Sequence, residues 1–204
     1  MTEPSSTGRL RLLAAAEELF ATRGLGVPNR EIVAAAGQHN QSAITYHFTS
    51  RAGLIDAVRE RHEAPIAQHR QHLIARLPGP CERRTRQLVE AQVQPLAAEM
   101  LRSAPSYWAR LSELLLPDQP RSELSRLMVA HLRRLPEAEA NGRVALAVRF
   151  VNSGLARWER DSQAGVAGTL PLASFTLILT DLAVAMLDAP SSVPPWTEAR
   201  PTIG

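Results

Sequence analysis

The stretch that decides the fold is residues 38–58, which read QHNQSAITYHFTSRAGLIDAV. It predicts a short helix over residues 41–48, a Ser-Arg turn, and then a longer amphipathic helix. Asn40 stands where a side-chain oxygen can cap the short helix. Ile44 and Phe48 lie one turn apart and can face inward, which leaves an outer face that is polar but uncharged. Such a face is typical of a helix that contacts base edges and phosphates in a major groove.

The candidate DNA contacts are the polar or small side chains of this helix and its flanks, together with two arginines. Gln41 can pair bidentately with adenine, and Ser42 and Ala43 are small enough for close approach to base edges. Arg51 offers a planar donor fork that fits a phosphate. The complete set of predicted DNA contacts is Arg30, Asn40, Gln41, Ser42, Ala43, Thr45, Tyr46, His47 and Arg51.

Two further helices are predicted upstream, over residues 9–23 and 30–36. Apolar residues in the first recur at core spacing, and Gly24 follows in the C-terminal capping position. Asn29 is the expected cap of the second helix, and Gly37 ends it in a turn. Two short helices joined at a glycine, the second with a polar face, are typical of a helix-turn-helix, in which the second helix reads DNA.

A resemblance to a known family is carried by three segments in order, RLRLLAAAEELFATRG, EIVAAAG and AITYHFTSRAGLIDAV. Together they resemble the DNA-binding head of the tetracycline-repressor (TetR) family of transcriptional regulators, over roughly the first quarter of the chain. The Tyr-His-Phe and Ser-Arg element within residues 46–51 is the most specific part. Departures are Arg51 where the family commonly has lysine, and a one-residue difference in the loop on each side of the helix at residues 30–36.

The resemblance implies an all-α protein with an N-terminal three-helix helix-turn-helix head and a larger helical body for ligand binding and dimerisation. We expect a DNA-binding domain over residues 1–51, an effector-binding and dimerisation domain over 52–188, and a Pro-rich tail over 189–204. Pro65 predicts a kink or a break in the first helix of the body, because proline removes a backbone donor and clashes with the preceding turn. Pro95 predicts another kink.

The last two long helices, predicted over residues 136–160 and 171–187, have broad apolar faces that need a partner surface. The resemblance implies that they pair with their copies across a twofold axis into a four-helix bundle. Burial within one chain is the alternative. The expected interface residues are Val144, Val148, Val151, Leu155, Phe175, Leu179, Leu182 and Met186.

The resemblance also implies an effector cavity among the central helices of the body, including a helix predicted over residues 104–116. An aromatic pair beside an arginine on that helix suits an apolar or anionic ligand. The alternative is ordinary core packing of the aromatic rings. The expected pocket residues are His69, Tyr107, Trp108, Arg110 and Leu111.

Charge and composition restrict the remaining possibilities. Residues 1–60 hold as many Arg as Asp plus Glu, so a DNA-binding head must cluster its basic groups, with Arg9, Arg11, Arg30 and Arg51 as candidates. The single cysteine excludes an intrachain disulfide, and no signal peptide is apparent, so we expect a cytoplasmic protein. The most apolar run, residues 170–187, is interrupted by polar side chains and short for a bilayer, which predicts a buried helix and no membrane partner.

Catalytic motifs are missing: there is no glycine-rich phosphate loop and no GxSxG elbow, which excludes the common enzyme classes built on them. His62, His69 and His72 lie near one helical stripe and leave zinc or nickel binding open, although no cysteine cluster accompanies them.

We therefore expect a non-enzymatic, ligand-responsive transcriptional regulator without a cofactor. It would be a repressor that binds a palindromic operator in double-stranded DNA as a homodimer, and a small-molecule effector would release it. The alternative is a helical dimeric protein that binds a small molecule or a metal and does not read DNA.

Overall fold

The structure is a computed structural model of the chain, and it describes residues 4–79, 83–103, 105–115 and 122–191. Within these ranges the secondary structure is entirely helical, which confirms the predicted all-α class. None of these helices combines the length and the apolar character that a bilayer span requires. The Pro-rich tail expected over residues 189–204 falls largely outside the described part of the chain.

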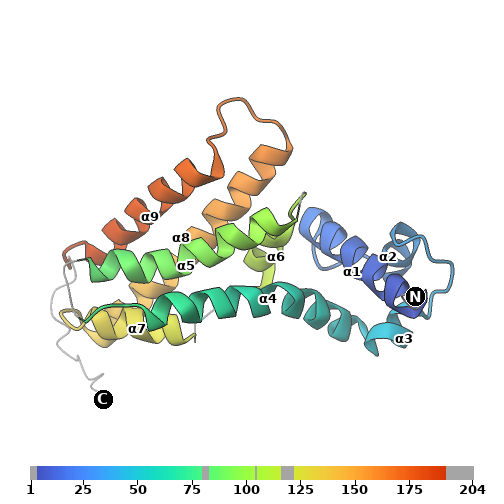
Figure 1. Ribbon diagram of the computed structural model, residues 1–204, viewed down its shortest axis with the longest axis horizontal. Helices are drawn as coiled ribbons and strands as arrows, with labels where there is room; N and C mark the ends of the chain where they lie inside the picture. Colours follow the sequence, from blue (N-terminus) through green and yellow to red (C-terminus); the bar gives the residue numbers. More distant parts are fainter. Residues whose placement is uncertain (1–3, 80–82, 104, 116–121, 192–204) are drawn as a thin grey trace, which may run out of the picture.

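The helices form a small N-terminal group, here called the head, at one end of an elongated molecule, and a larger group, the body, at the other (Figure 1). The head consists of α1 (Pro4–Arg23), α2 (Asn29–Ala35) and α3 (Ala43–Phe48). The body consists of α4 (Arg51–Ala75), α5 (Arg84–Arg102), α6 (Trp108–Leu115), α7 (Glu123–His131), α8 (Glu137–Gln163) and α9 (Leu172–Asp188).

The core of the head is closed by a residue of the body. Phe20 of α1, Ile32 of α2 and Ile44 of α3 are at most 2% exposed, and so is Leu54 in the first turns of α4. Burying side chains of this size stabilises a fold by roughly 1.5 to 3 kcal/mol each. The head therefore depends on α4, which continues from it directly into the body.

The helix α4 runs without interruption through Pro65, so the break that the sequence allowed there does not occur. Proline in a helix removes one backbone hydrogen bond and disfavours the preceding turn. Here the buried side chains of His62 and Ile66, one on each side of the proline, pack the same stretch into the body. Tertiary packing thus overrides the local preference, and α5 likewise continues through Pro95.

Two helix starts differ from the sequence expectation. Asn29 is the first residue of α2 and not its cap, because Pro28 occupies the N-cap position with an extended backbone. The helix α3 begins at Ala43, two residues later than predicted, with Ser42 as its N-cap. Asn40 instead accepts hydrogen bonds from the Ser42 backbone N–H and hydroxyl, at 2.9 and 2.7 Å, in the turn before α3.

Much of the apolar face of α8 and α9 packs within one chain, which is the alternative that the sequence left open beside a dimer interface. Both helices rise together out of the body as an antiparallel pair (Figure 1). Of the eight residues expected at a dimer interface, five are buried in the single chain, Phe175 and Met186 are partly buried, and Leu182 is half exposed. Periodicity identifies an apolar face but not its partner, which is why this expectation is corrected for Val144, Val148, Val151, Leu155 and Leu179.

A matched pair of glycine substitutions tests the close approach of α3 to α4. A Cβ atom on Gly53 would lie 2.1 Å from the carbonyl oxygen of Phe48, whereas one on Gly142 in α8 would meet no atom within 4 Å. We expect Gly53→Ala to lower the free energy of unfolding by about 1 to 3 kcal/mol, since backbone must move to relieve the clash. Gly142→Ala should raise it by about 0.5 to 1 kcal/mol. Urea unfolding followed by circular dichroism measures both, and equal stability of the two variants would contradict the close approach.

Candidate nucleic-acid interface

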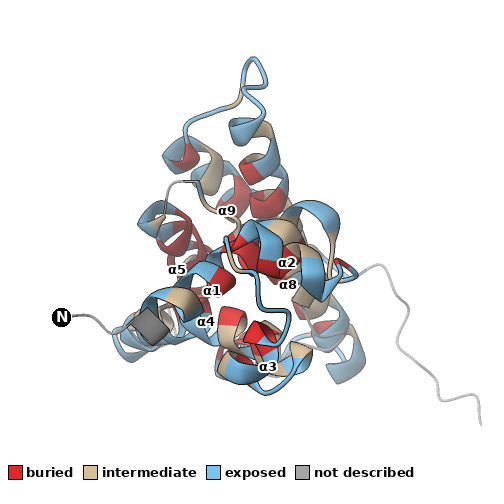
Figure 2. Ribbon diagram, turned by 90° about the vertical axis from the view of Figure 1, so that its right-hand side faces the viewer, coloured by how far each residue is buried: buried red, intermediate tan, exposed pale blue. Residues whose placement is uncertain are grey.

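The helix α3 has one face in the core of the head and the other in solvent. Ala43, Ile44 and Phe48 are buried, whereas Thr45 is exposed and Tyr46 is 76% exposed. Figure 2 views the molecule from the end at which the head lies and shows the mixed burial of α3. The short helix therefore offers a polar, uncharged surface on a buried apolar support.

The beginning of α1 lies beside α3 and adds positive charge to this end of the head. The side-chain amide of Gln38 donates to the Gly8 carbonyl oxygen at 2.9 Å, and the Arg9 guanidinium lies 5.0 Å from the centroid of the Phe48 ring. The N-terminus of a helix carries a partial positive charge, which favours phosphate nearby. Arg9 was among the arginines expected to cluster, but sequence reasoning missed Gln38, whose partner lies 30 residues away.

Most of the predicted DNA contacts are accessible around α3. Six are exposed and His47 is partly exposed; the exposed ones are Arg30, Asn40, Gln41, Ser42, Thr45 and Tyr46. Ala43 is the exception, because only 5% of its surface is exposed and its side chain lies in the core of the head. The Ala43 side chain therefore does not face outward with those of Thr45 and Tyr46, which the sequence did not show, and a contact between Ala43 and base edges stays a prediction.

Arg51 is engaged within the head. Its guanidinium donates to the Asn29 side-chain oxygen at 2.5 Å and to the Leu25 carbonyl oxygen at 2.6 Å, and it lies 5.3 Å from the centroid of the Phe20 ring. These contacts tie the segment between α1 and α2 to the start of α4. The Arg51 guanidinium, which the sequence suggested as a phosphate contact, therefore makes hydrogen bonds within the head. A phosphate contact by Arg51 stays a prediction.

The exit from α3 is strained. Thr49 has a φ of +66°, and among the described residues it is the one position other than glycine with a positive φ. A β-branched residue rarely adopts this conformation, and such strain costs on the order of 1 to 3 kcal/mol. Ser50 follows at once as the N-cap of α4 and accepts from the Gly53 backbone N–H at 3.0 Å. Thr49 therefore makes the sharp reversal that sets the angle between α3 and α4.

The five residues expected in an effector pocket have different surroundings. Trp108 and Leu111 are buried in the packed body, and the side chain of Arg110 forms an ion pair with Glu159 at 3.1 Å. His69 lies partly exposed on α4. Tyr107 lies elsewhere, in a cleft between the head and the body.

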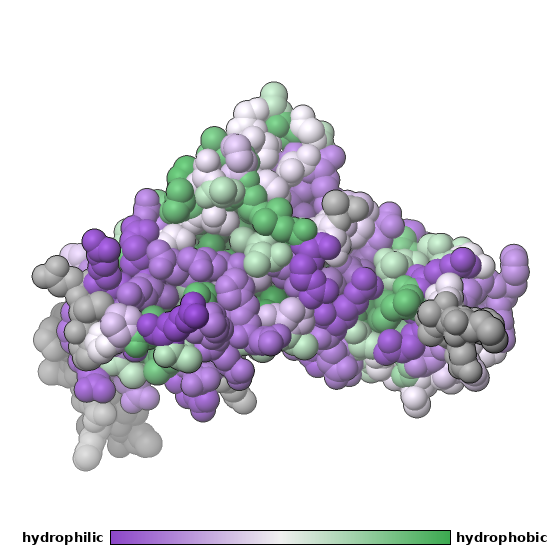
Figure 3. Space-filling view, viewed as in Figure 1, coloured by the Kyte–Doolittle hydropathy of each residue, from purple (hydrophilic) through white to green (hydrophobic). Residues whose placement is uncertain are grey.

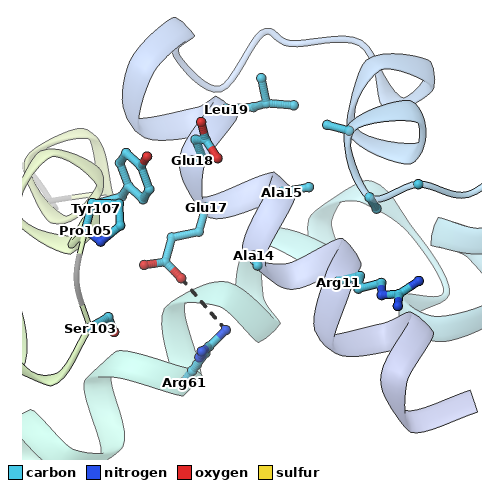
Figure 4. Close-up of a pocket in the computed structure, with 13 residues that line it drawn as sticks. Arg11, Ala14, Ala15, Glu17, Glu18, Leu19, Arg61, Ser103, Pro105 and Tyr107 are labelled. Carbon is cyan, nitrogen blue, oxygen red and sulfur yellow. Dashed lines mark ion pairs between the residues drawn. The ribbon is translucent and has the colours of Figure 1, made fainter.

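This cleft has a volume of about 690 Å³ and is walled by both parts of the molecule. Figure 4 shows Glu17 and Glu18 of α1 between Tyr107 on the left and Arg11 on the right, with Arg61 of α4 below and paired with Glu17. Burial, and then the nearby carboxylate of Glu18, raise the pKa of Tyr107. The cleft differs from the cavity among central body helices that the sequence analysis expected.

The three histidines considered as metal ligands are also separated. His62 is buried, His69 is partly exposed and His72 is exposed. Over the described ranges, no group of three or more His, Cys, Asp or Glu side chains is arranged to hold a metal ion. The histidine stripe therefore does not form a metal site in this structure.

Comparison with known proteins identifies the head. Residues 12–58, from α1 to the first turns of α4, match the sequence model of a family described as bacterial regulatory proteins, tetR family. Over these residues the head is similar to the DNA-binding head of that family. The match covers the helix-turn-helix and the part of α4 that closes its core, so DNA binding in transcriptional regulation is the function of this class of head.

Two solved structures resemble the chain more distantly. A TetR-family regulator from Streptomyces coelicolor A3 is 16% identical, with 92% of this chain and 98% of that one covered and a TM-score of 0.41. A TetR transcription regulatory protein from Mycobacterium vanbaalenii is 24% identical, with 90% and 95% covered and a TM-score of 0.35. No curated protein sequence matches the chain. At these values the distant likenesses add nothing to the assignment of the tetR-family head.

Two arginine substitutions distinguish an arginine that stabilises the head from one that lies on its surface. We expect Arg51→Ala to lower the free energy of unfolding by roughly 1 to 2 kcal/mol, because the partly exposed guanidinium makes two charge-assisted hydrogen bonds within the head. Arg30→Ala, at an exposed position, should change it by less than about 0.5 kcal/mol. Thermal unfolding measures both, and an Arg51→Ala variant as stable as Arg30→Ala would assign Arg51 to the surface.

Proposed function

We propose that this protein is a ligand-responsive transcriptional repressor that binds a palindromic operator as a homodimer and is released by a small-molecule effector. The observation that carries the proposal is the exposed polar face of α3, supported from below by Ala43, Ile44 and Phe48 in a tetR-family head. A helix of this kind fits a major groove.

Different residues would serve affinity and sequence recognition. Gln41, Ser42 and Thr45 carry donors and acceptors that suit base edges, and they are exposed. Tyr46 and His47, with Arg9 and the N-terminal end of α1 beside them, suit phosphates. In a dimer the two α3 helices would enter successive major grooves, roughly 34 to 36 Å apart.

The dimer proposal now rests on the outer surface of α8 and α9. Leu177 and Leu182 of α9 are 65% and 50% exposed, and Ile178 and, on α8, Leu146 are also exposed. Apolar colour gathers on the projecting α8–α9 pair in Figure 3. Exposed apolar patches on water-soluble domains commonly mark interaction sites, and a second copy would bury this one symmetrically.

The cleft between head and body supports the proposed release by an effector. Its walls come from α1 of the head, from α4 and from the segment before α6, so an occupant would contact both parts at once. A ligand that binds better to one relative orientation of head and body shifts the protein toward that orientation, with a coupling of typically about 1 to 3 kcal/mol.

Gel-shift titration at several salt concentrations, with duplexes selected from a random pool, tests DNA reading. We expect Gln41→Ala and Thr45→Ala to cost about 1 to 3 kcal/mol on selected sites and to relax sequence preference at single positions. Arg9→Ala should weaken binding to all duplexes similarly and reduce the salt dependence.

Glu60→Gln, an exposed change on α4 away from α3, serves as the control and should leave affinity unchanged. Retention of no duplex even at low salt would instead favour the alternative, a helical dimeric binding protein that does not read DNA.

The dimer surface is tested by introducing charge on α9. Leu177→Arg and Leu182→Arg should shift the protein to monomers in sedimentation velocity, because each would place an unpaired charge in an apolar interface. Leu101→Arg, at a leucine that is 74% exposed at the end of α5, is the matched control and should leave the mass unchanged. A dimer that survives both α9 changes would place the interface elsewhere.

A further inference from the structure

His62 is buried at the junction of head and body, between carboxylates from the two parts. Its Nδ1 lies 2.6 Å from a carboxylate oxygen of Glu99 on α5, and its Nε2 lies 3.0 Å from a carboxylate oxygen of Glu17 on α1. The three side chains are 3%, 2% and 9% exposed, in the order His62, Glu99, Glu17. The imidazole therefore touches a buried acid of the head and a buried acid of the body.

Further side chains from α4, α5 and α6 contact His62 or its two carboxylate neighbours. Arg61 on α4 lies 4.0 Å from Glu17, and Arg102 on α5 lies 3.1 Å from Glu99. From α6, the uncharged ring of Trp108 stacks on the imidazole, with centroids 4.6 Å apart and planes inclined by 16°. Among the described residues, the charged side chains in contact at this site from α1, α4 and α5 are thus the carboxylates of Glu17 and Glu99 and the guanidinium groups of Arg61 and Arg102.

Contacts at the start of α6 connect His62, through Trp108, to α8. Glu159 on α8 is 2% exposed and accepts hydrogen bonds from the backbone N–H groups of Ala109 and Arg110, both at 3.2 Å, at the start of α6. These bonds satisfy amide donors that the first turn of a helix leaves without partners. Trp108, which stacks on His62, is thereby held relative to α8, one of the two helices proposed for the dimer.

The protonation state of His62 decides whether both carboxylates are satisfied. A neutral imidazole has one N–H donor and one lone pair, so it can donate to Glu17 or Glu99 but not to both. The imidazolium carries N–H groups on both nitrogens: Nδ1 can donate to Glu99, and Nε2 forms an ion pair with Glu17 whose geometry is not that of a hydrogen bond. Burial by itself lowers the pKa of His62, but the interactions with the Glu17 carboxylate, followed by those with Glu99, outweigh burial and raise the pKa above the ordinary value of 6.5.

We propose that His62, as an imidazolium held between Glu17 and Glu99, is the positioning residue that fixes the orientation of the head on the body, and that its deprotonation loosens this joint. Because the folded-state pKa is raised, the stabilisation is complete below about pH 6.5 and is lost as pH rises through the raised value. Above it, one buried carboxylate faces a lone pair, and the head keeps its apolar contacts but loses its most directional one. The inference concerns the free protein and does not depend on DNA binding.

Two measurements on the full chain test the joint. NMR of ring-labelled histidine follows the protonation of His62, and electron-spin distances follow the separation of labels at Thr22→Cys on α1 and Ala130→Cys on α7. The labelled protein also carries Cys81→Ser, so that only the two introduced cysteines take a label. Mixing it with an excess of unlabelled protein removes distances between labels on different copies. From about pH 5.5 to about pH 9, the distance distribution should broaden with the midpoint at which His62 titrates. A distribution that stays unchanged while His62 titrates overturns the proposal.

Variants distinguish a positioning role from general instability. His62→Gln, which is neutral at every pH, should give the broad distribution throughout the range. His72→Gln, at an exposed histidine on the same helix, should keep the wild-type transition. Glu99→Gln removes one carboxylate and should move the midpoint to lower pH. If His62→Gln fails to fold, the wild-type and Glu99→Gln titrations still decide, since a midpoint that does not follow His62 contradicts the proposal. Loss of DNA binding alone would change none of these readouts.

Discussion

The structure depends on a single helix, α4, serving two cores. Its first turns supply Leu54 to the core of the head, while His62 and Ile66 pack into the body. A head of about fifty residues buries too small a fraction of its surface to be more than marginally stable alone, so this shared helix is a physical requirement. Because the backbone of α4 is continuous through Pro65, the head is joined to the body by a hydrogen-bonded rod, and any change of orientation must involve the contacts made around that rod.

The proposed DNA-reading surface of α3 depends on buried residues that hold this helix in place. A helix of six residues, the length of α3, is unstable by itself in water. It persists because Ile44 and Phe48 are packed beneath it and because Thr49 and the cap at Ser50 fix its exit. Arg51, just after that exit, ties the start of α4 to the segment between α1 and α2. With the lower face and the exit of α3 held in this way, its outer side chains are left for recognition. The residues that position α3 are therefore different from those that would contact DNA.

Buried ionic groups supply directional contacts between the head and the body, which apolar packing does not supply. Apolar contacts are non-directional, so they hold the head against the body without fixing one angle. The Glu99–His62 hydrogen bond and those of Glu159 at the start of α6 are buried and directional, and the buried Glu17–His62 ion pair adds a contact from the head. Buried ionic groups carry a desolvation penalty, and replacing them by apolar residues often stabilises a protein. Their position at the junction of α1, α4, α5, α6 and α8 matches a role in setting geometry more than a role in stability.

The sequence by itself determined the all-α class and the helix-turn-helix, because both follow from local signals: helical periodicity, glycines at turns and a polar face beside an apolar one. Only the tertiary structure decided that α4 passes through Pro65, that Ala43 faces inward, that Arg51 binds Asn29, and that most of the apolar face of α8 is buried within one chain. It alone brought His62 between Glu17 and Glu99, which are 45 and 37 residues away along the chain. Periodicity shows which face of a helix is apolar and must be buried. The residues that pack against this face come from distant segments of the chain, so no local sequence pattern identifies them.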